Sequence, residues 1–137
     1  MTSLKQWFVL TVFSALACSG LNAQIVNMRA NIPFDFHAGD KVMPAGEYQI
    51  HGEGTWVTVH PVNGGKPVTT FTTISAVGAD PNRAAQLDFQ RYGDTYFLKA
   101  IWKGHSADGR ELVPEASEKK LAKQAKPART VILVASR

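Results

Sequence analysis

The sequence predicts a mainly β protein, a single antiparallel β-sandwich or small β-barrel with one short C-terminal helix followed by a last strand. Apolar and polar residues alternate over residues 26–36, as in a strand with one buried face. Further short apolar stretches follow, separated by turn residues at a spacing typical of sandwiches and barrels. Residues 115–125 place acids early and lysines late after a proline, which is the pattern of a helix.

The N-terminus predicts export. A lysine precedes an apolar run at residues 7–17, and a small and polar stretch follows that run, which is the layout of a secretory signal peptide. The run is too short to cross a bilayer as a stable helix. We expect a signal peptide at residues 1–23 that is cleaved after Ala23. Gln24 then begins a single mostly-β domain at residues 24–137.

A lipoprotein signal at residues 1–17 is the alternative, and its cleavage would leave a lipid on Cys18. Cys18 is the only cysteine of the chain, so neither cleavage leaves an intramolecular disulfide, and stability must come from a core. The chain has 15 Lys and Arg against 11 Asp and Glu, a net charge of +4, and the excess lies in residues 110–137. Because the protein is expected to be exported, we expect no nucleic-acid partner for this basic segment.

The first two predicted elements are a strand at residues 26–36 and a hairpin. Pro33 falls on the polar side of the strand and cannot donate to a ladder, which favours an edge strand or one that switches sheets. In the hairpin, a four-residue loop at residues 52–55 brings apolar residues opposite one another and leaves Trp56 on the outer face. Its predicted core face is Tyr48, Ile50, Val57 and Val59.

The second hairpin is predicted at residues 84–102, around a two-residue type II′ turn that begins at Gly93. This register places Phe89 opposite Leu98 on the core face. On the opposite face it pairs Asp88 with Lys99 as a cross-strand ion pair and leaves two aromatic residues outward, namely Tyr92 and Phe97.

The remaining elements are shorter or less distinctive. Residues 67–77 are rich in β-branched side chains and are predicted to form a strand. Residues 110–113 are predicted to be a short extended piece before the helix at 115–125, which Pro127 ends. Residues 130–135 are continuously apolar, so we expect a last strand that is buried on both faces or fills a central slot.

The residue inventory predicts no catalytic residue, no cofactor and no metal site. The favoured mature chain has no cysteine, and no G-x-S-x-G pattern marks a nucleophilic serine. The acids lie mostly in turns, although a carboxylate pair of the kind that hydrolyses glycosides remains an alternative. The histidines have no spacing typical of metal ligands; they are His37, His51, His60 and His105.

Three aromatic residues form the candidate ligand surface: Trp56, Tyr92 and Phe97. Exposed aromatic rings on a β-surface can stack on sugar rings or contact a partner protein. The alternative is that the helix or loops cover these outward positions.

Three motifs resemble those of small exported bacterial proteins of unknown function. They are IPFDF followed by PAGEY within residues 32–48, RYGDTYFLKAIW at residues 91–102 (RYGDxYFLxxIW), and GREL followed by LAK within residues 109–123. The resemblance implies export and one compact domain. It brings no catalytic residue, ligand or partner.

The sequence as a whole predicts an exported, non-enzymatic binding or structural module, periplasmic or secreted, with no transmembrane span in the mature chain. Its partner is unknown, and the expected classes are a cell-envelope glycan or a protein. One alternative is an envelope structural protein, anchored to the membrane by lipid, whose basic C-terminal tail contacts an anionic surface. A second alternative is a small carboxylate-dependent hydrolase.

Overall fold

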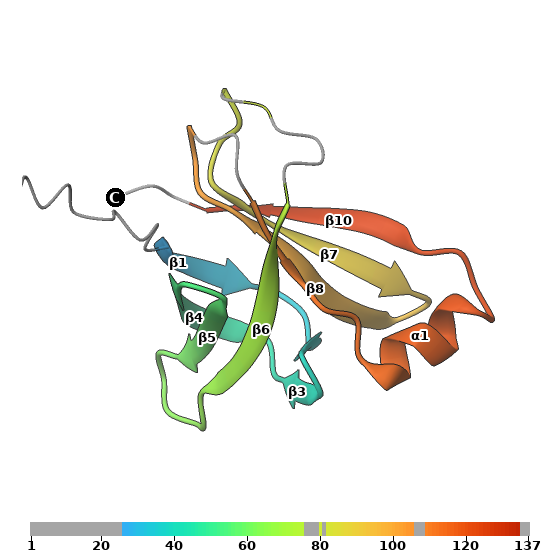
Figure 1. The fold of residues 1–137 in the computed structure, drawn as a ribbon. Coiled ribbons are helices and arrows are strands. Elements are labelled where there is room, and N and C mark those ends of the chain that lie inside the picture. Colours follow the sequence, from blue (N-terminus) through green and yellow to red (C-terminus); the bar gives the residue numbers. More distant parts are fainter. Residues whose placement is uncertain (1–25, 76–79, 81, 106–108, 135–137) are drawn as a thin grey trace, which may run out of the picture.

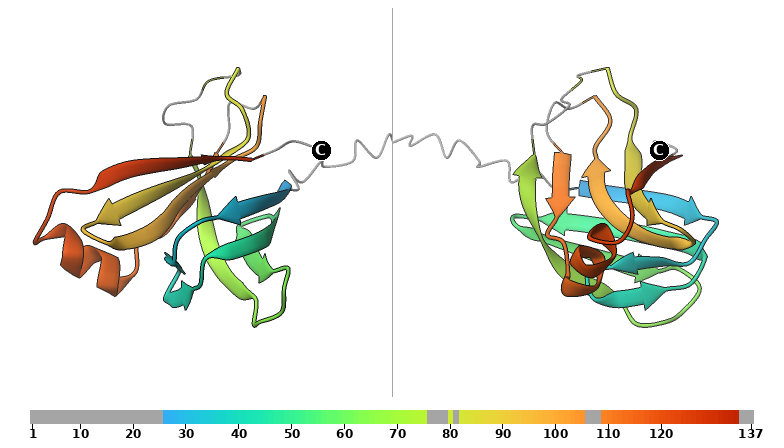
Figure 2. Two further views of the ribbon diagram at one scale, coloured as in Figure 1. Left: turned by 180° about the vertical axis from the view of Figure 1, so that it is seen from behind. Right: turned by 90° about the vertical axis from the view of Figure 1, so that its right-hand side faces the viewer.

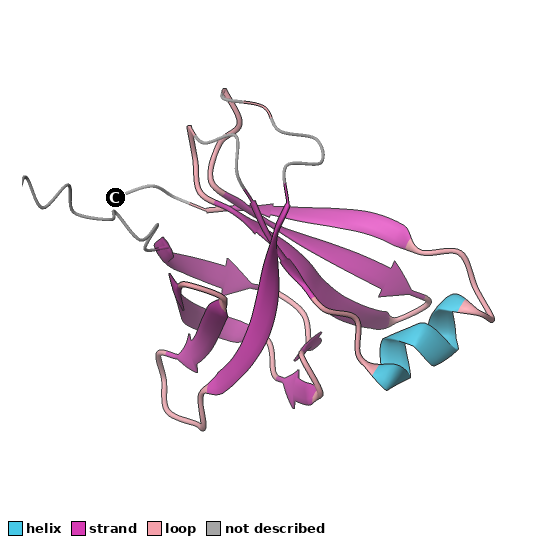
Figure 3. Ribbon diagram, viewed as in Figure 1, coloured by secondary structure: helices cyan, strands magenta, loops and turns pink. Residues whose placement is uncertain are grey.

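The structure is a computed structural model that describes residues 26–75, 80, 82–105 and 109–134. In this part of the chain, ten strands form one mixed, mostly antiparallel sheet, and a single short helix lies near the C-terminus before the final strand (Figures 1 and 3). The predicted mainly β fold is therefore confirmed. The elements are β1 (Val26–Ile32), β2 (Phe36–Ala38), β3 (Lys41–Met43), β4 (Gly46–Glu53), β5 (Trp56–Pro61), β6 (Val68–Ser75), β7 (Gln86–Tyr92), β8 (Thr95–Trp102), β9 (Gly109–Leu112), α1 (Ala116–Ala122) and β10 (Ala128–Leu133).

The sheet is open and folds over itself. Its strands follow the order β1-β4-β5-β6-β9-β8, and on the other edge of β8 lie β7 and then β10. The short β2 pairs in parallel with β8, and β3 continues beyond it. Among the described residues β1 and β10 form no ladder with each other, so the barrel does not close. Figure 2 shows the part built from β1, β4 and β5 folded across the part built from β7, β8 and β10.

The core lies between these two parts. It is built from the inward side chains of β1, β4 and β5 on one side and of β7, β8 and β9 on the other. Phe36 joins the two sides, because its ring lies edge-to-face with both Tyr48 (5.2 Å between centroids) and Phe89 (5.6 Å). Such aromatic pairs contribute about 0.5–1.5 kcal/mol each beyond the area that they bury. The Tyr48 hydroxyl donates to the carbonyl of Pro44.

The first strand follows the predicted alternation but is shorter than predicted, because it ends at Ile32 and not at residue 36. Every second residue of β1 is buried, and β1 pairs with β4 alone among the described strands, so it is an edge strand. After Pro33 the chain leaves this edge and enters β2, which pairs with β8. Pro33 thus lies just after β1, where the chain crosses to the other half of the sheet. This position suits proline, because it has no N–H to donate to a ladder.

The loop predicted between β4 and β5 is wrong, although the predicted core face is right. Glu53 pairs with Trp56, so the turn has two residues, and Ile50 lies opposite Val59. The turn begins with Gly54 at φ 58°, the left-handed conformation that suits glycine in the first position of a two-residue hairpin turn. Because the register differs from the predicted one by two residues, each side chain stays on its predicted face.

The hairpin of β7 and β8 has the predicted turn, with Tyr92 opposite Thr95 and a positive φ at Gly93. The register shifts between Asp88 and Phe89, so Asp88 lies opposite Ala100. The predicted ion pair between Asp88 and Lys99 is therefore wrong. The shift is a β-bulge that leaves Lys99 as an extra residue on β8, and it changes the direction of the neighbouring side chains.

The prediction that the last strand is buried on both faces is also wrong. β10 pairs with β7 alone among the described strands, and its Leu133 side chain is 70% exposed. A continuous apolar run cannot by itself distinguish a central strand from an edge strand. The helix begins and ends inside the predicted range of 115–125.

The buried carboxylate of Asp88 joins β7, β8 and β10. It accepts hydrogen bonds from Nε1 of Trp102 (3.1 Å) and Nε2 of Gln86 (2.7 Å), and it forms an ion pair with Arg129 (2.8 Å). The Asp88 side chain is 11% exposed, whereas that of Arg129 is 61% exposed. Three donors on one buried carboxylate remove most of the free-energy cost of burying its charge.

We predict that Asp88→Asn lowers the free energy of unfolding by about 2 kcal/mol, because an amide loses the ion pair and cannot accept from all three donors. Urea unfolding measures the change. The matched control is Asp94→Asn in the exposed turn between β7 and β8, expected within about 0.5 kcal/mol of the wild type. Equal midpoints for the two variants would show that Asp88 does not hold these strands together.

Candidate binding surface

The outward side chains of β1, β4, β5 and β6 form one exposed surface, here called the outer face. Their register aligns Asn27, His51, Thr58 and Thr69 in a row that crosses all four strands. The hydroxyls of Thr58 and Thr69 lie 2.9 Å apart. The row therefore offers an amide, an imidazole and two hydroxyls side by side, and each can donate or accept a hydrogen bond.

An aromatic pair stands in the next row. Trp56 of β5 lies directly opposite Phe71 of β6, with ring centroids 3.6 Å apart and planes tilted by 33°. Trp56 is 46% exposed and Phe71 is 53% exposed. Two large apolar rings held against each other on an exposed surface form a rigid platform, and ordering it for a ligand costs little conformational entropy.

Polar contacts orient the side chains on the other side of the row. The guanidinium of Arg29 pairs with the carboxylate of Glu47, and Nε2 of Gln49 donates to Oδ1 of Asn27 over 3.3 Å. Exposed pairs of this kind add little to stability. Their effect here is to hold the amide and guanidinium groups of β1 and β4 in place on the outer face.

The three aromatic residues of the candidate ligand surface do not lie together. Trp56 is exposed, but Tyr92 is 6% and Phe97 is 2% exposed, so the surface expected from all three is absent. Phe97 is covered because β2 pairs with β8 there and the ring of His37 stacks on it at 4.5 Å. Burial lowers the pKa of His37. The Tyr92 hydroxyl donates to Oε1 of Gln90.

Phe71 is the residue that the sequence did not single out. It lies in a strand where threonines occupy both faces, so the alternation of that strand carries no contrast between buried and exposed positions. Only the pairing of β5 with β6 places Phe71 beside Trp56.

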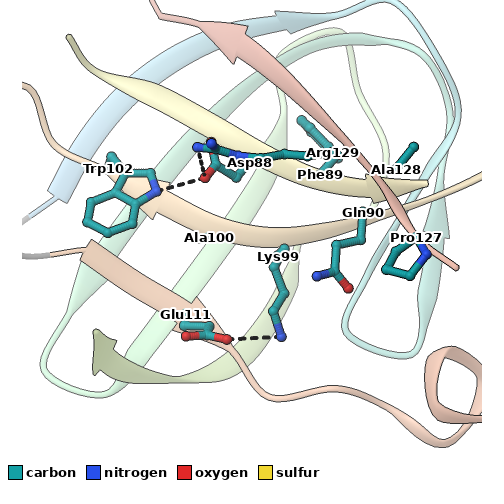
Figure 4. A pocket seen from close by; sticks show the side chains of 10 residues that line it. All are labelled: Asp88, Phe89, Gln90, Lys99, Ala100, Trp102, Glu111, Pro127, Ala128 and Arg129. Carbon is teal, nitrogen blue, oxygen red and sulfur yellow. Dashed lines mark hydrogen bonds and ion pairs between the residues drawn. The ribbon is translucent and has the colours of Figure 1, made fainter. Parts of the chain in front are cut away.

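A second polar cluster lies on the outside of the other half of the sheet. A cavity of about 240 Å³ is lined by residues of β7, β8, β9 and β10 (Figure 4). It holds two carboxylates, and both have partners: Asp88 is held as described above, and Glu111 forms an ion pair with Lys99 at 3.0 Å. This cavity therefore contains no pair of unpartnered carboxylates to serve as acid and base.

The helix α1 places Glu118 near this cluster, and Glu118 is its one buried residue. Burial raises the pKa of Glu118, Lys99 opposes that rise, and Glu111 adds to it. Burial and the charge of Glu118 also raise the pKa of Tyr92. The groups that act on Glu118 thus come from β8 and β9.

The described ranges contain no group of three His, Cys, Asp or Glu side chains that could hold a metal ion. Within the same ranges, no helix is both long and apolar enough to cross a membrane. Comparison of the chain with models of protein families, with known proteins and with solved structures finds no match. The resemblance to small exported bacterial proteins stays a prediction.

We predict that Glu118→Gln makes the protein more heat-stable at pH 7 and that this gain shrinks as the pH falls toward 4. The pKa of Glu118 is higher in the folded than in the unfolded protein. Below the unfolded-state pKa the carboxyl is protonated in both states, and its full contribution to stability is present. That contribution to stability is lost as the pH rises through the raised folded-state pKa, because the carboxyl ionises. The side chain of glutamine stays neutral, so the variant does not lose stability in this way.

The melting temperature measured across this pH range tests the prediction. Asp40→Asn is the control, because Asp40 is exposed on the turn between β2 and β3. A gain for Glu118→Gln that does not depend on pH would contradict the account.

Proposed function

We propose that the protein is an exported, non-enzymatic binding module of the cell envelope or the secreted fraction, and that it binds a glycan on the outer face. The observation that carries the proposal is the exposed Trp56–Phe71 pair beside the row of Asn27, His51 and Thr58. A sugar has an apolar C–H face and a rim of hydroxyls. The ring pair matches the first, and the polar row matches the second.

The composition of the outer face favours a glycan over a protein partner. Interfaces between proteins have an apolar core and bury about 800 Å² on each partner. On the outer face the large apolar side chains are the two rings of Trp56 and Phe71, and polar groups surround them. A polar surface with one aromatic platform suits a ligand that stacks locally and forms hydrogen bonds along its length.

The exported location rests on the predicted signal peptide. The expected cleavage after Ala23 and the alternative lipid on Cys18 both lie outside the described residues. An envelope or secreted location gives the protein access to extracellular polysaccharides, which agrees with the proposed ligand class. The hydrolase alternative is not favoured by the cavity of Figure 4, because both of its carboxylates are already partnered.

The binding proposal predicts that Trp56→Ala weakens glycan binding at least about tenfold, since it removes one half of the stacking platform. A glycan array identifies the ligand, and titration calorimetry compares the variants. The control is Val113→Ala, because Val113 is as exposed as Trp56 (46%) but lies between β9 and α1. Melting curves for both variants verify the fold. Binding that survives Trp56→Ala unchanged, or a wild-type protein that binds no glycan, would remove the proposal.

The export proposal predicts that the protein recovered from its native host begins at Gln24. Intact-mass spectrometry of the purified protein reads this directly. A mass that corresponds to a diacylated or triacylated Cys18 would instead establish the lipid-anchored alternative, in which the basic tail lies near the membrane surface.

A further inference from the structure

A cavity of about 720 Å³ opens at the free edge of β1. It is continuous with the outer face, because Asn27, Arg29 and Gln49 belong to both. Its far wall comes from the segment that follows β8 and from the end of β10, through Lys103, His105 and Leu133. The cavity therefore lies where the two ends of the open sheet face each other without pairing.

Backbone hydrogen bonds hold the far wall in place. The N–H of His105 donates to the carbonyl of Arg83 over 3.0 Å, and the N–H of Val134 donates to that of Ala85 over 2.9 Å. His105 adopts a φ of 58°, and it is the one non-glycine residue with a positive φ in the described chain. A left-handed conformation at a non-glycine residue costs free energy and persists only where its surroundings hold it. The backbone of His105 is thus held at this wall of the cavity.

The lining of the cavity carries more positive than negative charge. Glu47 is the one carboxylate in its lining, and it is paired with Arg29. Lys103 adds a positive charge that no carboxylate of the lining balances, and His105 adds an imidazole that can form hydrogen bonds. The amides of Asn27, Asn31 and Gln49 supply further donors. An anionic group could pair with cations and accept hydrogen bonds from N–H donors here. A neutral group would gain much less binding free energy, because its hydrogen bonds would not be charge-assisted.

We propose that this cavity binds an anionic substituent, a carboxylate or a phosphate, of the same glycan that stacks on Trp56 and Phe71. The inference rests on the proposed function and narrows its ligand to acidic glycans. Three interstrand spacings, about 14 Å, separate β6 from β1 across the sheet, so the ligand is an oligomer whose acidic unit lies several sugar units from the stacked one.

The test is an array that carries uronic, sialic and phosphorylated glycans, each beside a neutral counterpart of the same backbone. We expect the wild type to prefer the acidic member of a pair by at least about tenfold at low salt, and the preference to fall as salt is added. Comparison of the carboxylated and phosphorylated members shows which anion the cavity takes.

Two variants separate the cavity from the platform. Lys103→Gln should reduce the acidic preference to within about threefold while binding of the neutral members is unchanged, and Trp56→Ala should weaken both members equally. Lys120→Gln is the control, because it removes the same charge from the exposed face of α1.

Each outcome has a distinct meaning. Equal binding of acidic and neutral members by the wild type, or an acidic preference that survives Lys103→Gln, overturns the inference and leaves the proposed function standing. A wild type that binds no member of the array overturns both.

Discussion

Along β1, β4 and β5 the core takes every second side chain, and this requirement determines what the other side chains can do. Tyr48 and Ile50 are almost completely buried, so the residues that alternate with them must face outward. The outer face therefore follows from the packing of the core. A shift of one residue in the pairing of any of these strands would turn its core side chains outward and its outer-face side chains inward. Both the core and the outer face would then be lost.

The same requirement fixes how the side chains of the outer face are arranged. Strand pairing aligns the polar row, and the two rings of Trp56 and Phe71 support each other across β5 and β6. On the other half of the sheet the outward residues are taken up by the protein itself, through the stacking of His37 on Phe97 and the donors around Asp88. On this half the aromatic ring of Phe97 and the carboxylate of Asp88 are thus covered or partnered, whereas Trp56 and Phe71 stay exposed on the outer face.

Local patterns made most of the fold predictable from the sequence. Alternation gave the buried faces of β1, β4 and β5, and glycine at the first turn position gave the hairpin of β7 and β8. Long-range pairing was not predictable: nothing local showed that β2 would cover Phe97, that β10 would lie at an edge, or that Phe71 would meet Trp56. Trp56 was therefore predicted from the sequence as part of the candidate surface, whereas Phe71 could be identified only once the order of the strands in the sheet was known.

We propose that a ligand binds on the outer face and in the cavity that adjoins this face at the edge of β1. Chemical-shift mapping with an array-selected glycan tests this most directly. The account predicts that the largest shifts fall on the Trp56 indole N–H, on Phe71 and on the amides of β1 and β4 near Arg29. Shifts that cluster around Trp102 and Arg129, at the cavity on the other half of the sheet, would contradict it.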